Sequence, residues 1–321
     1  MPQTPVLALL APGQGSQTPG MLTPWLELSG AADRLAAWSE ISGLDLAQLG
    51  TTATAEEITD TAVTQPLVVA ATLLAHEELT KRLGERSDGG KTGLLTNAQL
   101  IVAGHSVGEI AAYAIAGVIS ADEAIKLAAT RGAEMAKACA LEPTGMAAVL
   151  GGDEAEVLAR LEALELVPAN RNAAGQIVAA GAVAALEKLA EDPPAKARVR
   201  VLATAGAFHT HYMGSAQEPY AAAAATVIPS EPTTTLLSNA DGQPVADAAD
   251  AMTKLVAQMT RPVRWDLCSA TLRERFAGQE VTGIIEFPPA GTLTGIAKRE
   301  VKGVPTYAIK TPADLDGLTE F

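Results

Sequence analysis

The segment Gly104-His105-Ser106-Val107-Gly108 lies between an apolar run, residues 100–103, and an alanine-rich run, residues 109–116. This order predicts a buried strand, a tight turn that carries one serine, and a helix, which is the setting of a nucleophile elbow. The two glycines leave room where side chains would collide with the neighbouring strand and helix. The Ser106 hydroxyl would then lie at the carboxyl edge of the sheet, at a helix N-terminus that favours negative charge. A strand–helix turn with a capping serine is the plainer alternative.

The composition indicates a large aliphatic core in an acidic protein. Of the 321 residues, 48% are hydrophobic, 3% are aromatic and 19% are charged, so alanine, valine, leucine and isoleucine must build the core. This length allows one large domain with an insertion, or two domains. The formal net charge of -14 argues against general nucleic-acid binding, which needs a basic surface, and against binding to an anionic membrane.

Cysteine content and hydropathy suggest where the protein works. Cys139 and Cys268 lie far apart in sequence and form neither a disulfide framework nor a zinc motif, which favours a reducing compartment. The N-terminus lacks a basic segment and Pro12-Gly13 interrupts its apolar run, so we expect no signal peptide. No apolar stretch approaches the ~20 residues of a membrane span. We therefore expect a soluble cytoplasmic protein. We also expect it to be a monomer.

Short apolar runs alternate with helical patterns over most of the chain, which predicts a mostly parallel sheet with helices on both faces. The pattern changes near residue 141, where short strands and helices follow one another closely. They predict a compact α+β insertion over residues 141–205. The expected strands of the main sheet are residues 6–11, 100–103, 233–237, 284–287 and 304–309, and those of the insertion are 146–150, 176–180 and 197–203.

Three further segments carry candidate site residues. Gln14 lies in a glycine-rich turn after the first strand, where amides can converge on an anion, although an ordinary turn is the alternative. Thr64-Gln65-Pro66 is expected to open a helix with proline at its first position, so Gln65 either caps this helix or lines a site. Arg131 lies on a helix that Ser120 is expected to cap, and an isolated arginine of this kind is usually solvated.

Two of the four histidines form the segment His209-Thr210-His211. The spacing raises the possibility of a metal site, but no carboxylate lies beside the pair and no third ligand motif is visible. A buried, hydrogen-bonded histidine is the structural alternative. Because an elbow serine needs a base, a general base is favoured here. We expect no metal and no resident cofactor.

Six separated motifs together resemble the malonyl-CoA:acyl carrier protein transacylase family, which is related to the acyltransferase domains of polyketide and fatty acid synthases. The resemblance runs from about residue 6 to about residue 300. The motifs are Pro12-Gly13-Gln14-Gly15-Ser16-Gln17, Thr64-Gln65-Pro66, Gly104-His105-Ser106-Val107-Gly108-Glu109, Arg131-Gly132, Ala207-Phe208-His209 and Arg261-Pro262-Val263-Arg264-Trp265.

The resemblance implies a fold and a role for each matching residue. The implied fold is an α/β-hydrolase-like parallel-sheet core, residues 1–140 and 206–321, with an inserted ferredoxin-like subdomain, residues 141–205. Ser106 is the implied nucleophile and His209 its base, in a dyad without a catalytic aspartate. The backbone amides of Gln14 and Val107 are implied to bind the oxyanion, and Arg131 is implied to pair with the malonyl carboxylate. The backbone carbonyl of Gln258 is implied to orient the histidine. Gln65 and Phe208 are implied to contact the substrate, and the Phe208 ring would crowd an α-methyl group.

The implied reaction is ping-pong transfer of a malonyl group from malonyl-CoA to the phosphopantetheine thiol of an acyl carrier protein, through an ester on Ser106. A serine hydrolase on the same fold is the alternative enzyme, but none of Asp122, Asp153 and Asp192 is well placed as its acid. A non-catalytic module that binds acyl-CoA or a carrier protein is the third reading.

Charge raises a question about the carrier protein. Carrier proteins of this family are acidic, as this chain is, so docking is expected to use a local basic patch. The candidate clusters are Lys81-Arg82, Lys196 with Arg198 and Arg200, and Lys298-Arg299 with Lys302.

Overall fold

Five parallel strands form the sheet around which the larger part of the protein is built. The structure is a computed structural model that describes residues 6–85, 98–277 and 281–318. The strand order is β7-β2-β1-β8-β9, and each neighbouring pair is parallel. The strands are β1 Val6–Ala11, β2 Gln99–Gly104, β7 Thr235–Leu237, β8 Val281–Glu286 and β9 Thr306–Ala308.

The central strand β1 is buried along its whole length. Successive side chains of a strand point to opposite faces, so Leu7 and Leu9 pack into one core while Ala8 and Leu10 pack into another. The predicted parallel sheet with helices on both faces is therefore confirmed. The helices of the first core are α1 Ala31–Ser42, α2 Leu46–Thr51, α3 Thr61–Glu85, α5 Gly108–Ile115, α6 Ala121–Cys139, α9 Gly214–Ala224, α10 Ala248–Ala257 and α13 Asp314–Gly317, and those of the second are α11 Trp265–Phe276 and α12 Thr292–Glu300.

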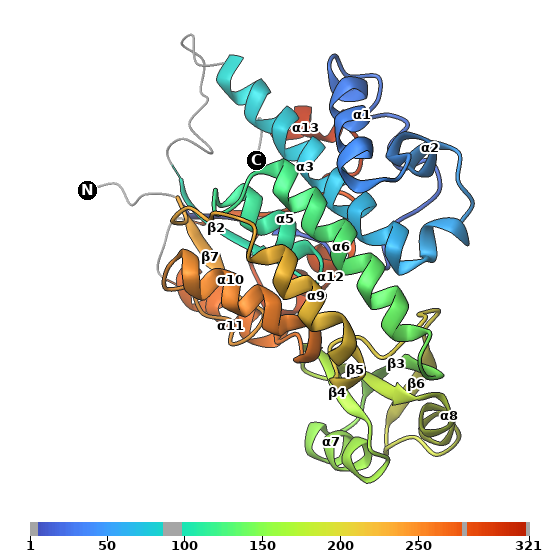
Figure 1. Ribbon diagram of the computed structural model, residues 1–321. Helices are drawn as coiled ribbons and strands as arrows, with labels where there is room; N and C mark the ends of the chain where they lie inside the picture. The colour runs from blue at the N-terminus through green and yellow to red at the C-terminus, as the bar shows by residue number, and fades with distance from the viewer. Residues whose placement is uncertain (1–5, 86–97, 278–280, 319–321) are drawn as a thin grey trace.

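A second, antiparallel sheet lies at one end of the molecule, at the lower right of Figure 1, with α7 and α8 beside it. Its chain order, βαββαβ, and its strand order, β4-β5-β3-β6, are those of a ferredoxin-like unit, as predicted. One face of this sheet packs on the two helices around Val149, Leu161 and Leu186. Its elements are β3 Thr144–Gly151, α7 Glu154–Ala163, β4 Val167–Ala173, β5 Gln176–Ala182, α8 Val183–Glu191 and β6 Ala197–Val201.

Strand β4 was not predicted from the sequence. It reads Val-Pro-Ala-Asn-Arg-Asn-Ala, and proline and asparagine are both depleted in strands. β4 is an edge strand, and its pairing with β5 is irregular between Pro168 and Asn170. An edge strand tolerates a proline, because one side of its backbone pairs with no other strand of the sheet.

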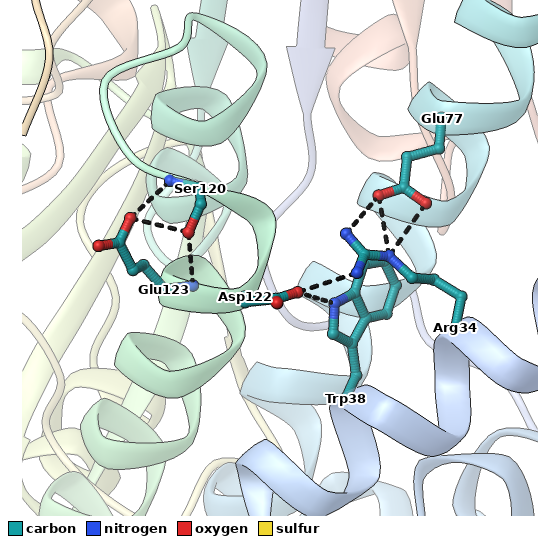
Figure 2. A network of polar contacts seen from close by, with 6 residues as sticks. All are labelled: Arg34, Trp38, Glu77, Ser120, Asp122 and Glu123. Carbon is teal, nitrogen blue, oxygen red and sulfur yellow. Dashed lines mark hydrogen bonds and ion pairs between the residues drawn. The ribbon is translucent and has the colours of Figure 1, made fainter.

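Helix α6 is fixed at its start by polar contacts. Ser120 and Glu123 form a capping box, as Figure 2 shows, so the predicted cap is confirmed. Asp122 accepts hydrogen bonds from Arg34 and from the indole of Trp38, both at 3.0 Å, and Arg34 also pairs with Glu77 of α3. These contacts tie α1, α3 and α6 together and hold the helix that carries Arg131.

Helix α3 begins earlier than the sequence analysis expected. It starts at Thr61, because Asp60 accepts a hydrogen bond from the amide of Ala62, so Pro66 lies inside the helix and not at its first position. The missing N–H of Pro66 leaves the Ala62 carbonyl without its helical partner. Gly132 of α6 packs at this point, where a Cβ would lie 2.7 Å from the Thr61 carbonyl oxygen. Within the described ranges, no helix combines the length and apolar character needed to cross a membrane.

The turn from β2 to α5 leaves no space for side chains at its two glycines. A Cβ on Gly104 would collide with the backbone of Gly108 and Glu109, and one on Gly108 would collide with the carbonyl groups of Ala11 and Pro12. Backbone atoms cannot move aside as the end of a flexible side chain can. The predicted mechanical reason for both glycines is confirmed.

We expect Gly108→Ala to destabilise the protein by about 1–3 kcal/mol, the usual cost of overpacking a tight site. Urea denaturation followed by circular dichroism measures this. Gly214→Ala is the matched control, because Gly214 has a helical φ of -57° and a Cβ there would meet nothing within 4 Å. Equal stability of the two variants would contradict the steric explanation.

Candidate active site

Ser106 and His209 meet at the carboxyl edge of the parallel sheet. Ser106 Oγ lies 2.7 Å from His209 Nε2, although the residues come from the β2–α5 turn and from the segment that follows β6. Both have a positive φ, 54° and 61° respectively. Such a backbone costs a non-glycine residue about 1–3 kcal/mol and concentrates at functional sites. The structure therefore holds the serine and the histidine together at some cost in backbone strain.

The environment of His209 keeps its imidazole neutral. Its Nδ1 lies 2.9 Å from the backbone carbonyl oxygen of Gln258, so Nδ1 carries the proton and Nε2 is left as the acceptor for the Ser106 hydroxyl. Burial, together with the positive charge of Arg131, lowers the pKa of His209 to about 3. A neutral imidazole with a free nitrogen toward a hydroxyl is the arrangement of a general base.

The side chain of Gln258 connects the dyad to a buried arginine. Gln258 Nε2 donates to Glu109 at 2.6 Å and to the Ser106 carbonyl at 3.1 Å. Gln258 Oε1 accepts from Arg131 Nη2 at 2.8 Å. Together with its backbone carbonyl, this one residue contacts Ser106, His209 and Arg131.

Arg131 is buried with its charge uncompensated by direct contact. It is only 1% exposed, and its other hydrogen bond goes from Nη1 to Gln65 Oε1 at 2.7 Å. Its Nε has no hydrogen-bond partner, and no carboxylate within the described residues forms an ion pair with it. Because a guanidinium has five N–H donors, several remain free for a bidentate contact with a carboxylate. The expectation of a solvated arginine is wrong for Arg131.

Gln65 lies inside α3 and is fully buried, so the interpretation as a helix cap is also wrong. Its Nε2 donates to Thr61 Oγ1 at 2.9 Å, and Thr61 Oγ1 in turn donates to Gln14 Oε1 at 3.2 Å. This chain of contacts links Arg131 to the turn after β1. Gln65 orients the arginine in this structure.

Two backbone amides lie beside the serine. Gln14 follows β1 and Val107 follows Ser106, and β1 and β2 are adjacent, with Ala11 opposite Gly104. Among the residues that the structure describes, no acceptor pairs with the N–H of either Gln14 or Val107. Val107 is also the N-cap of α5, where the helix dipole favours negative charge. The two amides are available to bind an oxyanion.

A pocket of about 160 Å³ opens at the dyad, between the large sheet and the small one. Phe208 lines it beside His209, and Gln14 lines it beside Ser106. The small sheet contributes Met146 from β3, Val178 from β5, and Asn170 and Asn172 from β4. The remaining lining residues are Gly13, Ser16, His105, Leu202, Thr204, Thr292, Leu293 and Ile296.

Sequence reasoning assigned no role to Glu109 or to Asn239. Glu109 is fully buried below the elbow, and burial raises its pKa to about 7. Asn239 donates its backbone N–H to Glu109 at 2.6 Å, and its Oδ1 accepts the Ser106 N–H at 2.8 Å. Asn239 follows β7, which is the neighbour of β2, so both strands end at the same edge of the sheet. The position of Asn239 directly after a strand could therefore have indicated that it lies near Ser106.

The other candidate residues lie away from the dyad. His211 is exposed, and its ring packs against Tyr212 at 4.2 Å between centroids. Asp122 binds Arg34, Asp153 caps α7, and Asp192 pairs with Arg160. Since Nδ1 of His209 is bonded to a carbonyl, none of these aspartates takes the place of a triad acid.

Comparison with known proteins gives one consistent result. The family model of the acyl transferase domain matches residues 9–312. The chain is 82% identical over 301 residues, 94% of its length, to the whole malonyl CoA-acyl carrier protein transacylase of Mycolicibacterium smegmatis. It is 70% identical over 316 residues, 98% of its length, to the whole protein of that name from Mycobacterium tuberculosis. A crystal structure of MCAT from Mycobacterium tuberculosis superposes with a TM-score of 0.91, covering 98% of this chain and 99% of that one at 70% identity.

Replacing Arg131 by glutamine should raise the pKa of His209, because the arginine charge lowers it and burial remains. A base acts in its neutral form, so the acid limb of reactivity should move to higher pH in the variant. The measurement is the pH dependence of the rate at which a neutral sulfonyl fluoride, which needs no carboxylate contact, modifies Ser106.

Lys137→Gln is the control, since it removes an exposed charge from the same helix. Circular dichroism defines the pH range in which each variant stays folded. An acid limb that stays in place or moves to lower pH in Arg131→Gln would contradict the coupling between Arg131 and His209.

Proposed function

The chain belongs to the acyl transferase domain family, and we propose that it transfers a malonyl group from coenzyme A to the phosphopantetheine thiol of an acyl carrier protein. The observation that carries this proposal is the buried Arg131 beside the Ser106–His209 dyad. A fixed, uncompensated positive charge next to a nucleophile selects an acyl group that ends in a carboxylate. The names of the two mycobacterial relatives support the same substrates.

In the first half-reaction, His209 Nε2 takes the proton of Ser106 as Oγ attacks the thioester carbon. The oxyanion that forms lies on the amides of Gln14 and Val107, and losing one such donor typically costs about 100- to 1,000-fold in rate. The C–S bond then breaks, and the departing thiolate receives the proton held by His209. Ser106 is left as a malonyl ester.

The second half-reaction reverses these steps with a different thiol. The phosphopantetheine thiol gives its proton to His209 while its sulfur attacks the ester carbon. The same two amides hold the oxyanion, and the Ser106–ester bond breaks with return of the proton to Oγ. Throughout, the Gln258 carbonyl keeps Nδ1 protonated and Nε2 directed at the reacting atoms.

Phe208 supports a preference for malonyl over methylmalonyl groups, because an aromatic ring that lines this small pocket crowds an α-methyl substituent. The two cysteines are free thiols, which agrees with a reducing compartment. A cytoplasmic location, a monomeric state and independence from any cofactor stay predictions.

Intact-protein mass spectrometry tests the proposed function. Brief mixing with malonyl-CoA should place one malonyl group on the protein, and added phosphopantetheinylated carrier protein should remove it and become malonylated. Ser106→Ala should form no adduct. An adduct that is released as malonate at the same rate with and without carrier protein would identify a hydrolase, and a wild-type protein that forms no adduct would identify a binding module.

Arg131→Ala should lower kcat/KM for malonyl-CoA by about 10- to 100-fold, as expected when a charged hydrogen-bonded contact of about 1.5–3 kcal/mol is lost. Acetyl-CoA turnover should fall less or rise, so the malonyl preference is lost. Arg131→Lys keeps the charge without the bidentate geometry and should lie between the two. Full malonyl selectivity in Arg131→Ala would refute this role.

A further inference from the structure

The small sheet directs Arg200 to the same side as the catalytic pocket. Asn170, Val178, Ala148 and Arg200 are in register across β4, β5, β3 and β6, and residues in register share a face. Asn170 and Val178 line the pocket, so the Arg200 side chain leaves β6 on the pocket side. Two strand spacings, about 10 Å, separate β6 from β5.

A second row on this face carries one more arginine and binds another from α12. Gln176, Leu150 and Arg198 are in register two residues further along, a step of about 7 Å. Gln176 Oε1 accepts a hydrogen bond of 2.6 Å from Arg299, near the end of α12. Because α12 also lines the pocket through Leu293 and Ile296, this helix and the small sheet meet at one rim. We call Arg198, Arg200 and Arg299 the arginine rim.

The arginine rim is a positive site in an acidic protein. All three side chains are exposed, and within the described ranges none of them forms an ion pair. Six other arginines, Arg34, Arg82, Arg160, Arg171, Arg264 and Arg273, do pair with carboxylates. Among the described residues, Arg261 and Arg275 are also exposed without an ion pair, but they lie outside the small sheet and α12. With a net charge of -14 on the whole chain, three arginines without an ion pair on the pocket-facing side of the small sheet mark a place for an anion.

The size of the pocket places the charged end of the substrate outside it. Its volume of about 160 Å³ is smaller than the roughly 300–1,000 Å³ of pockets that enclose a drug-sized ligand. It therefore admits the acyl group and the adjoining part of an uncharged pantetheine chain. The phosphates of a coenzyme A thioester must lie beyond the opening.

We propose that the arginine rim binds the phosphate groups of the coenzyme A thioester that acylates Ser106. This inference rests on the proposed function. The arginine rim takes Arg198 and Arg200 from one of the basic clusters found in the sequence and Arg299 from another. The third cluster, Lys81-Arg82, is not part of it, because Arg82 pairs with Glu78 and Asp316. Arginine is suited to this task because its planar fork matches phosphate oxygens.

The test compares two malonyl donors on the double variant Arg198→Glu/Arg200→Glu. Malonyl-CoA carries the phosphates, and malonyl-pantetheine presents the same thioester without them. We expect kcat/KM for acylation of Ser106 to fall about tenfold or more with malonyl-CoA, with the loss shrinking as salt is added, and to stay unchanged with malonyl-pantetheine. Lys188→Glu is the control for the single variant Arg200→Glu, because both change the net charge by the same amount and Lys188 lies on α8, which covers the opposite face of the same sheet.

The outcomes separate this inference from the proposed function. An equal loss with both donors, or no loss with malonyl-CoA, would overturn the arginine rim while malonylation of Ser106 in the wild type upholds the function. A loss confined to malonyl transfer onto the carrier protein would also overturn it and assign the rim to that partner. Absence of Ser106 acylation in the wild type with either donor would instead refute the proposed function itself.

Discussion

The hydrogen bonds of Gln258 are the constraint on which the site depends. Its backbone carbonyl holds His209 Nδ1, its amide nitrogen holds Glu109 and the Ser106 carbonyl, and its amide oxygen holds Arg131. The buried carboxyl group of Glu109 accepts a hydrogen bond from Gln258 Nε2. Gln258 Oε1 is therefore directed at the Arg131 guanidinium and accepts a hydrogen bond from it. The orientation of one amide is thereby fixed by a carboxyl group on one side and a guanidinium on the other. A buried charge is tolerated only when such partners replace water.

The fold brings these groups together because parallel strands end at one edge of the sheet. β1 ends before Gln14, β2 before Ser106 and β7 before Asn239, while β2 can turn sharply only because Gly104 and Gly108 lack side chains. The inserted small sheet adds the other wall of the pocket. Its Asn172 lies 2.8 Å from His105 Nε2, and β4 bonds to the backbone of Val263 at 2.8 and 2.9 Å, so the insertion is attached directly beside the dyad.

The parts of the fold that follow from local patterns could be predicted from the sequence. β1 and the Ser120 cap match the local patterns that predict them. Local patterns also predict a compact α+β insertion, but they miss β4, because proline and asparagine are unusual in strands. The ferredoxin-like order of the insertion follows from the family resemblance and not from these patterns. The preference of proline for the first turn of a helix predicts a start of α3 near Pro66. The helix starts at Thr61 instead, because Asp60 accepts a hydrogen bond from the Ala62 amide. Contacts between distant segments could not be read from spacing. The burial of Arg131 depends on Gln65, 66 positions earlier, and on Gln258, 127 positions later, and no local pattern reports such a contact.

The central claim is that Gln258 couples carboxylate recognition by Arg131 to a dyad that is aligned by its backbone. Single-turnover acylation of Ser106 in Gln258→Ala, measured by rapid quench and mass spectrometry with malonyl-CoA and acetyl-CoA, tests it most directly. The substitution keeps the carbonyl that holds His209 and removes the amide that holds Arg131. The account predicts a much larger loss of rate with malonyl-CoA than with acetyl-CoA. Equal losses with the two donors, or an unchanged malonyl rate, would contradict it.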